Sequence, residues 1–147
     1  MKDPTIKLGI WAIIKDSIGK DISKLTVPVF FNDPLNLLQK CAASCEYINI
    51  LDKAAAAKDD QALRLAMVAV FGCTITTVCE RNSSKPFNPL LGETYELVTD
   101  DFDFLSEQVS HHPPITAAYC KGRKSNYVYW TNQKTNTKFN GKGMDFT

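Results

Sequence analysis

Two adjacent histidines, His111 and His112, are the residues of this chain whose types point most directly to chemistry. They stand in the stretch EQVSHHPPI (residues 107–115), with a serine before them and two prolines after them. An imidazole can ligate a metal, transfer a proton or donate a hydrogen bond to an anion. The surrounding residues therefore have to indicate whether the site binds a metal, catalyses a reaction or binds an anion.

The spacing gives little support to a metal site. Neighbouring residues of an extended strand point to opposite faces, so we expect the two imidazoles to diverge. The chain has no third histidine. Cys41 and Cys45 stand four residues apart and would share a helix face, but no CxxC motif accompanies them. We therefore expect no bound metal.

A catalytic site lacks a recognisable motif. Ser110 adjoins His111, but a triad also needs a third group that orients the base, and the chain has no GxSxG turn. Glu93 and Glu107 are a candidate carboxylate pair for acid–base chemistry, although their spacing does not distinguish them from surface acids. A histidine-dependent hydrolase stays an alternative, and the sequence favours a protein that is not an enzyme.

An anion site is the third interpretation. Imidazole N–H groups can donate to a phosphate, and prolines after the pair stiffen the backbone. The upstream stretch SKPFNPLLGE offers the Lys85 ammonium and the Asn88 amide between two further prolines. The two motifs could meet at one rim of a sheet and bind phosphate. On spacing alone, an equally good interpretation is that the prolines end strands and the histidines cap turns.

Helices are predicted for the first half of the chain. Isoleucines at helical steps over residues 6–18, with Trp11 beside them, predict a core helix or, alternatively, an amphipathic lid. Asp33 as N-cap and Pro34 as first residue predict the start of a second helix, and a third is expected over residues 61–79. The apolar stripe of the second helix is Leu38, Cys41, Ala42, Cys45 and Ile48, and the third helix has Ala62, Leu65, Ala69 and Cys73 at helical steps.

Strands are predicted for the second half. After a loop over residues 81–93 come TYELV, FLSEQV, ITAAYC, YVYWT and TKFNG, separated by turn-like clusters. Helices followed by strands predict an α+β fold with an antiparallel sheet of about five strands. The last of them would leave a bare edge, so we expect the chain to be part of a larger domain.

Composition excludes some classes of protein. Lys and Arg total 17 against 16 acids, which gives no electrostatic case for nucleic-acid binding. No stretch approaches the roughly 18 apolar residues of a membrane span, and the N-terminus does not fit a secretory signal. Five scattered cysteines fit a reducing compartment better than a disulfide framework. We expect a cytoplasmic protein.

The motifs also carry a family resemblance. EQVSHHPPI resembles the signature of the oxysterol-binding protein-related family, and KPFNPLLGETYEL (residues 85–97) resembles its second hallmark. DISKLTVPVFFNDPLNLLQ (residues 21–39) is similar to the segment after that family's N-terminal lid. The resemblance covers nearly the whole chain. It implies a lipid-binding domain in which an incomplete β-barrel encloses one lipid in an apolar tunnel.

The resemblance also assigns roles to residues. Lys85, Asn88, His111 and His112 match the family's contacts to the headgroup of phosphatidylinositol 4-phosphate. Residues 5–24 would form the lid, which replaces the core-helix interpretation; its lipid-contacting residues would be Ile10, Trp11, Ile14 and Ile18. The implied activity is exchange of a sterol or phosphatidylserine with that phosphoinositide at membrane surfaces, without cofactor or covalent chemistry.

The same resemblance predicts how the chain is organised. A helical segment over residues 33–80 should be followed, over residues 81–147, by the first barrel strands with both motifs. The family's domain is longer, and its later part supplies further strands and headgroup contacts. We therefore expect a partial domain, with a truncated lipid sensor or interaction module as the alternative.

Overall fold

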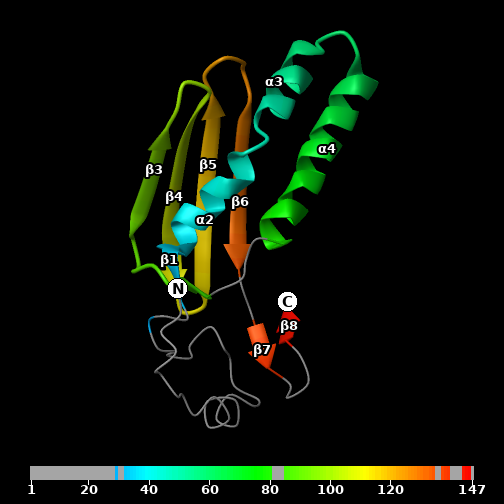
Figure 1. Cartoon of the computed structure of the whole chain (residues 1–147). Coiled ribbons are helices and arrows are strands. Elements are labelled where there is room, and N and C mark those ends of the chain that lie inside the picture. The colour runs from blue at the N-terminus through cyan, green and yellow to red at the C-terminus, as the bar shows by residue number, and fades with distance from the viewer. Residues whose placement is uncertain (1–28, 30–31, 81–84, 135–136, 140–143, 147) are drawn as a thin grey trace, which may run out of the picture.

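The computed structural model describes residues 29, 32–80, 85–134, 137–139 and 144–146, and these form the predicted α+β fold (Figure 1). The predicted lid residues Ile10, Trp11, Ile14 and Ile18 lie outside the described residues. The elements in chain order are β1 (Asn32–Asn36), α2 (Leu37–Ala42), the 3-10 helix η3 (Ala43–Cys45), α3 (Asn49–Ala56), α4 (Gln61–Glu80), β2 (Lys85–Phe87), β3 (Thr94–Val98), β4 (Phe102–His111), β5 (Pro114–Gly122), β6 (Val128–Lys134), β7 (Thr137–Phe139) and β8 (Met144–Phe146).

In the part of the chain that the structure describes, no helix has the length and apolar character needed to span a bilayer. The longest of the described helices, α4, has 20 residues. It packs against α3 and η3.

The strands of the described residues form three sheets rather than one. β3, β4, β5 and β6 make an antiparallel meander in chain order, whereas β1 pairs in parallel with β2 and β7 pairs with β8. The expected sheet of about five strands was therefore wrong in its last member, because the TKFNG segment pairs with the following β8 instead of β6. A short connection makes this local pairing cheap in loop-closure entropy.

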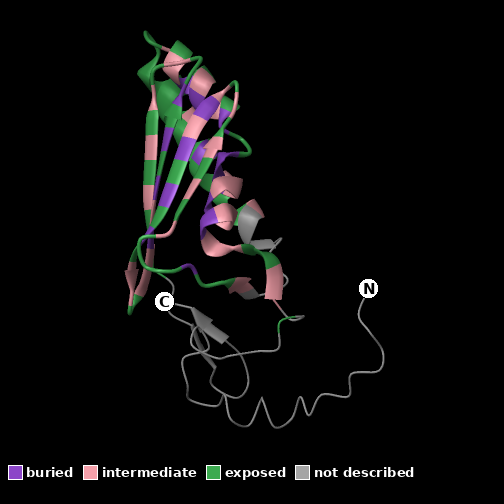
Figure 2. Cartoon of the chain, turned by 90° about the vertical axis from the view of Figure 1, so that its left-hand side faces the viewer, coloured by how far each residue is buried: buried purple, intermediate pink, exposed green. Residues whose placement is uncertain are grey.

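Within the described part of the chain, helices cover one face of the meander and not the other. Along β4, the side chains of Phe102, Phe104, Ser106 and Gln108 are buried, and those between them are partly or fully exposed. This alternation is the period of two expected for a strand with one face in the core. The helix α2 packs against β3, β4 and β5 on the buried face (Figures 1 and 2). The covered face therefore belongs to the core.

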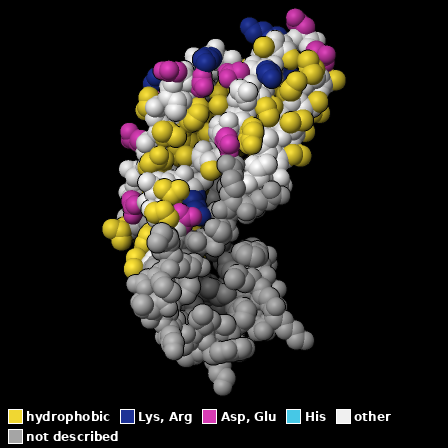
Figure 3. Space-filling view, in the orientation of Figure 1, with side chains coloured by type: hydrophobic (Ala, Val, Ile, Leu, Met, Phe, Trp, Pro, Cys, Tyr) yellow, Lys and Arg dark blue, Asp and Glu magenta, His cyan; other side chains and the backbone are white. Residues whose placement is uncertain are grey.

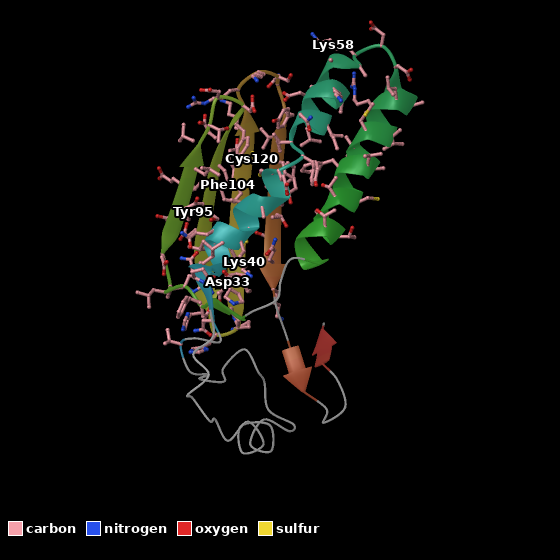
Figure 4. The ribbon with its side chains drawn as sticks, viewed as in Figure 1. Asp33, Lys40, Lys58, Tyr95, Phe104 and Cys120 are labelled. Atoms are coloured by element: carbon pink, nitrogen blue, oxygen red, sulfur yellow. The ribbon has the colours of Figure 1, made fainter. Side chains whose placement is uncertain are left out.

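The start of α2 differs from the prediction. Asn36, not Asp33, is the N-cap: its Oδ1 accepts from the Gln39 backbone N–H, and Gln39 Oε1 accepts from the Asn36 backbone N–H, each at 2.9 Å. This capping box satisfies two backbone donors at the helix start. Asp33 and Pro34 lie in β1, whose pairing with the distant β2 could not be read from the local motif. Asp33 instead forms an ion pair with Lys40 at 2.8 Å (Figure 4).

The predicted apolar stripe of the second helix is buried, although the helix is interrupted. Leu38, Cys41, Cys45 and Ile48 are each at most 3% exposed, and Ala42 is partly buried. They lie on α2, η3 and the turn before α3 instead of one continuous helix. The core cluster consists of Cys41, Cys45, Ile48, Leu51, Phe71, Phe102, Phe104, Ala118 and Cys120.

The helix α4 covers the predicted range, but the apolar residues noted at helical steps are not its buried face. Ala62, Leu65, Ala69 and Cys73 are exposed. Phe71 is the buried side chain, and its ring meets that of Tyr129 edge-on with centroids 5.2 Å apart. Apolar residues surround this helix, so periodicity does not select a face. Hydrophobic side chains gather over α4 on the surface shown in Figure 3.

The close packing of the β5–β6 turn predicts that Gly122→Ala destabilises the fold. A Cβ at this position would lie 2.5 Å from Tyr127 Cε1 and 2.7 Å from the Ser125 carbonyl oxygen. We expect a loss of about 1–3 kcal/mol, the usual cost of overpacking, measured as a lower thermal unfolding midpoint. Gly72→Ala in α4 is the matched control: its Cβ would meet nothing within 4 Å, so stability should hold or rise. Equal effects of the two variants would contradict the packing described.

Candidate functional site

The two motifs singled out in the sequence meet at one end of the meander. Lys85 begins β2 and Asn88 follows its end, while His111 ends β4 and His112 begins the turn into β5. Gln108 joins the two segments, since its Nε2 donates to Asn88 Oδ1 at 3.4 Å. A strand rises about 3.3 Å per residue, so His111 lies roughly 10 Å further along β4. Residues more than 20 positions apart thus share one end of the sheet.

A β-bulge sets the direction of His111. Val109 has no partner on β5, so β4 carries one extra residue there. Before the bulge Gln108 pairs with Thr116, and after it His111 pairs with Pro114, two positions from Thr116. Paired residues of an antiparallel sheet share a face, and alternate positions of a strand share a face. His111 therefore lies on the same face as Gln108, whereas a regular strand would place the two on opposite faces.

The two histidine rings are neighbours, contrary to the expectation that they diverge. Their centroids are 4.7 Å apart with the ring planes at 69°. The alternation of an extended strand stops at His111, because His112 already belongs to the turn. The Nδ1 atom of His111 is buried and has no hydrogen-bond partner among the described residues. The pair is a single imidazole-rich unit at the end of β4.

Neither candidate catalytic arrangement is assembled. The Ser110 hydroxyl donates to the Pro113 carbonyl oxygen at 2.7 Å. Glu93 pairs with Gln108 through the Gln108 N–H, and Glu107 is the neighbouring residue on β4. The two carboxylates therefore lie on opposite faces of the sheet, because adjacent strand positions alternate. The suggestion of a Glu93–Glu107 pair was wrong.

Glu93 instead holds the loop that carries Asn88. One carboxylate oxygen accepts from the Leu90 backbone N–H and the other from Asn36 Nδ2, each at 2.7 Å. The turn closes with a hydrogen bond from the Glu93 N–H to the Leu90 carbonyl, and Gly92 takes the positive φ of 76° that such a turn requires. Through Glu93, the loop is connected to the first turn of α2.

Two features of this region were missed in the sequence. Gln108 and Thr116 are both fully buried, and a polar residue at an inward position of a strand was the signal that could have identified them. Asn32 pairs with Lys85 between β1 and β2, and its side-chain oxygen is buried without a partner among the described residues. Its carbonyl oxygen is an acceptor placed beside the lysine motif.

Three of the cysteines belong to the core and not to this site. Cys41, Cys45 and Cys120 are buried free thiols, and burial raises the pKa of Cys41 to about 11. Cys41 Sγ donates to Gln133 Oε1 at 3.3 Å. Within the described ranges, no group of three or more His, Cys, Asp or Glu side chains is arranged to hold a metal ion.

Solved structures that resemble this chain include domains with a bound lipid. The chain is similar to the structure described as the Osh1 ORD domain in complex with ergosterol, with TM-score 0.82 and 40% identity, covering 99% of this chain and 34% of that one. It is also similar to the Osh3 ORD in complex with PI(4)P from Saccharomyces cerevisiae, with TM-score 0.79 and 28% identity, covering 99% of this chain and 39% of that one.

Sequence relatives agree with the structural ones. The family model described as oxysterol-binding protein matches residues 9–147. Human oxysterol-binding protein-related protein 6 is 45% identical over 146 residues, which is 96% of this chain and 15% of that protein. Oxysterol-binding protein homolog 2 of Saccharomyces cerevisiae is 41% identical over 98% of this chain and 11% of its own length. The chain belongs to the oxysterol-binding protein family, and it spans a small part of these relatives.

The contacts of Glu93 predict that Glu93→Gln destabilises the protein. The Glu93 carboxylate accepts hydrogen bonds from two N–H donors. A glutamine would place its own NH2 group, which cannot accept, against one of them. We expect a loss of roughly 1–3 kcal/mol, since hydrogen bonds to charged groups are the stronger ones, seen as a lower thermal unfolding midpoint.

Glu107→Gln is the matched control. Glu107 is exposed on the opposite face of the same sheet, and we expect its unfolding midpoint to stay within the change typical of surface substitutions. Two variants of equal stability would show that Glu93 does not hold the loop.

Proposed function

We propose that this chain is part of a lipid-binding domain that holds the headgroup of phosphatidylinositol 4-phosphate at the end of the meander. The residues that would bind it are Lys85, Asn88, His111 and His112. The observation that carries the proposal is the junction of the two motifs: Gln108 contacts Asn88, and the bulge turns His111 to the face of Gln108. The complex of the Osh3 ORD with PI(4)P supports the choice of ligand.

The chemistry of these side chains suits a phosphate. A phosphate monoester carries close to two negative charges at neutral pH and its oxygens are acceptors. A lysine ammonium supplies a point charge, and amide and imidazole N–H groups supply directed donors. The binding involves no bond breaking, so recognition of charge and geometry is the whole task of the site.

The second ligand and the activity are proposed for the complete domain. The Osh1 ORD structures contain ergosterol and cholesterol, which supports a sterol as the exchanged lipid; phosphatidylserine is the other candidate. We propose exchange with the phosphoinositide between membranes that the protein contacts peripherally from the cytoplasm. The lid over residues 5–24, with Ile10, Trp11, Ile14 and Ile18 against the lipid, is part of the same proposal. The chain covers 34% of the solved Osh1 domain, so enclosure of the lipid needs residues beyond it.

We expect Lys85→Glu, and separately the double variant His111→Ala with His112→Ala, to abolish extraction of the phosphoinositide by the full-length protein. Each removes charge-assisted donors worth roughly 1.5–3 kcal/mol, which is at least tenfold in affinity. The measurement is extraction of phosphatidylinositol 4-phosphate from phosphatidylcholine liposomes, with cholesterol uptake measured in parallel.

Cholesterol uptake should change little, because a sterol has no phosphate. Lys121→Glu makes the same charge reversal on the exposed face of β5 and should leave extraction intact. Phosphoinositide extraction that survives both site variants would show that the headgroup lies elsewhere.

Insertion of one alanine between Ile115 and Thr116 tests the bulge. The inserted residue gives Val109 a partner on β5, so alternation becomes regular and His111 should move to the face opposite Gln108. We expect phosphoinositide extraction to fall about as far as in the double histidine variant, with cholesterol uptake retained. Deletion of Val109 is the control, because it also removes the bulge but leaves His111 two positions after Gln108 and on the same face, so extraction should be retained. Extraction at the original level in the insertion variant would show that the face of His111 does not matter for headgroup binding.

A further inference from the structure

We propose that Gln108 is a positioning residue for the headgroup site: its buried amide orients Asn88 so that the Asn88 N–H groups face the phosphate. The inference rests on the proposed function, because it assigns Gln108 a role through Asn88. It concerns a residue that does not itself reach the surface, since Gln108 has no exposed area.

The orientation of Gln108 follows from its other partner. The Thr116 hydroxyl donates to Gln108 Oε1 at 2.7 Å, and both residues are fully buried. The two are paired on β4 and β5, so the strands keep them side by side. An amide group is planar with its oxygen and nitrogen on different sides. Once the hydroxyl occupies the oxygen, the nitrogen points to the remaining neighbour, and that neighbour is Asn88.

The orientation of Asn88 follows in turn. Gln108 Nε2 donates to Asn88 Oδ1 at 3.4 Å, so the carbonyl oxygen of Asn88 points inward and its Nδ2 points away from Gln108. Asn88 is exposed, and among the described residues its side chain is bonded through Oδ1 and not through Nδ2. The asparagine therefore presents two N–H donors outward.

The direction of this amide decides the sign of its interaction with a phosphate. Ionised phosphate oxygens accept hydrogen bonds and do not donate. An outward N–H attracts them, whereas an outward carbonyl oxygen would repel them. A side-chain amide free to rotate would spend part of its time in the repulsive orientation. Gln108 and Thr116 remove that freedom before the ligand arrives, which lowers the entropy cost of binding.

The test is a double-mutant cycle in the full-length protein. The variants are Gln108→Met, Asn88→Ala and their combination, and the readout is affinity for phosphatidylinositol 4-phosphate in phosphatidylcholine vesicles. We expect Gln108→Met to weaken binding by about three- to tenfold, as for one lost hydrogen bond. We expect Asn88→Ala to weaken it at least as much, and the combination to bind no worse than Asn88→Ala alone.

Two further variants separate positioning from folding. Ser106→Ala removes another buried hydrogen bond from the same face of β4, the bond to the Leu38 carbonyl at 3.2 Å, and should leave the ratio of phosphoinositide to cholesterol affinity unchanged. Thr116→Val keeps the Gln108 amide but removes the donor that orients it, and should lower the ratio without adding to Asn88→Ala. If Gln108→Met fails to fold, the Thr116→Val cycle gives the answer.

The outcomes distinguish the two proposals. If Asn88→Ala leaves phosphoinositide affinity unchanged, the proposed headgroup site is wrong and the role of Gln108 falls with it. If Asn88→Ala weakens binding while Gln108→Met or Thr116→Val has no effect, the site stands and the positioning role is wrong. Effects that multiply in the combined variants would also overturn the inference, because Gln108 would then act independently of Asn88.

Discussion

A side-chain amide that is buried without hydrogen bonds costs several kcal/mol, and Gln108 is fully buried. Its oxygen and nitrogen must both find partners, and they find them on two other segments: Thr116 on β5 and Asn88 after β2. The backbone of Gln108 also bonds to Gly92 and Glu93 on the β3 side. Gln108 thereby connects the loop with the lysine motif to the central strands. The link continues to the start of α2, because the Glu93 side chain accepts a hydrogen bond from Asn36.

The bulge at Val109 determines the face of the sheet on which His111 lies. A strand has only two faces, and one inserted residue exchanges them for everything that follows. His111 consequently lies on the face of Gln108, toward the loop that carries Asn88. The two motifs, which are separate in the chain, are joined by the hydrogen bond from Gln108 to Asn88.

The helices cover some apolar surfaces of the described fold and leave others exposed. The helix α2 covers the inward face of β4 and β5, and Phe71 of α4 contacts Tyr129 of β6. Much of α4 remains exposed, including Leu65 at 71%. Apolar surface of this extent is unfavourable in water. The chain matches 34% of the solved Osh1 domain.

The sequence by itself determined the local elements. The alternation of residues predicted the strands β3 to β6, and residues at helical steps predicted the helix α4. The two motifs identified Lys85, Asn88, His111 and His112 as candidate residues. Each of these predictions depends only on neighbours in the chain. Tertiary structure decided the rest. Asn36 and not Asp33 is the N-cap of α2, because Asp33 lies in β1, which pairs with β2. The helix α4 is apolar on several sides, and its packing in the fold buries the side with Phe71. The face of His111 and the partners of Gln108 depend on strand register, which no single segment contains.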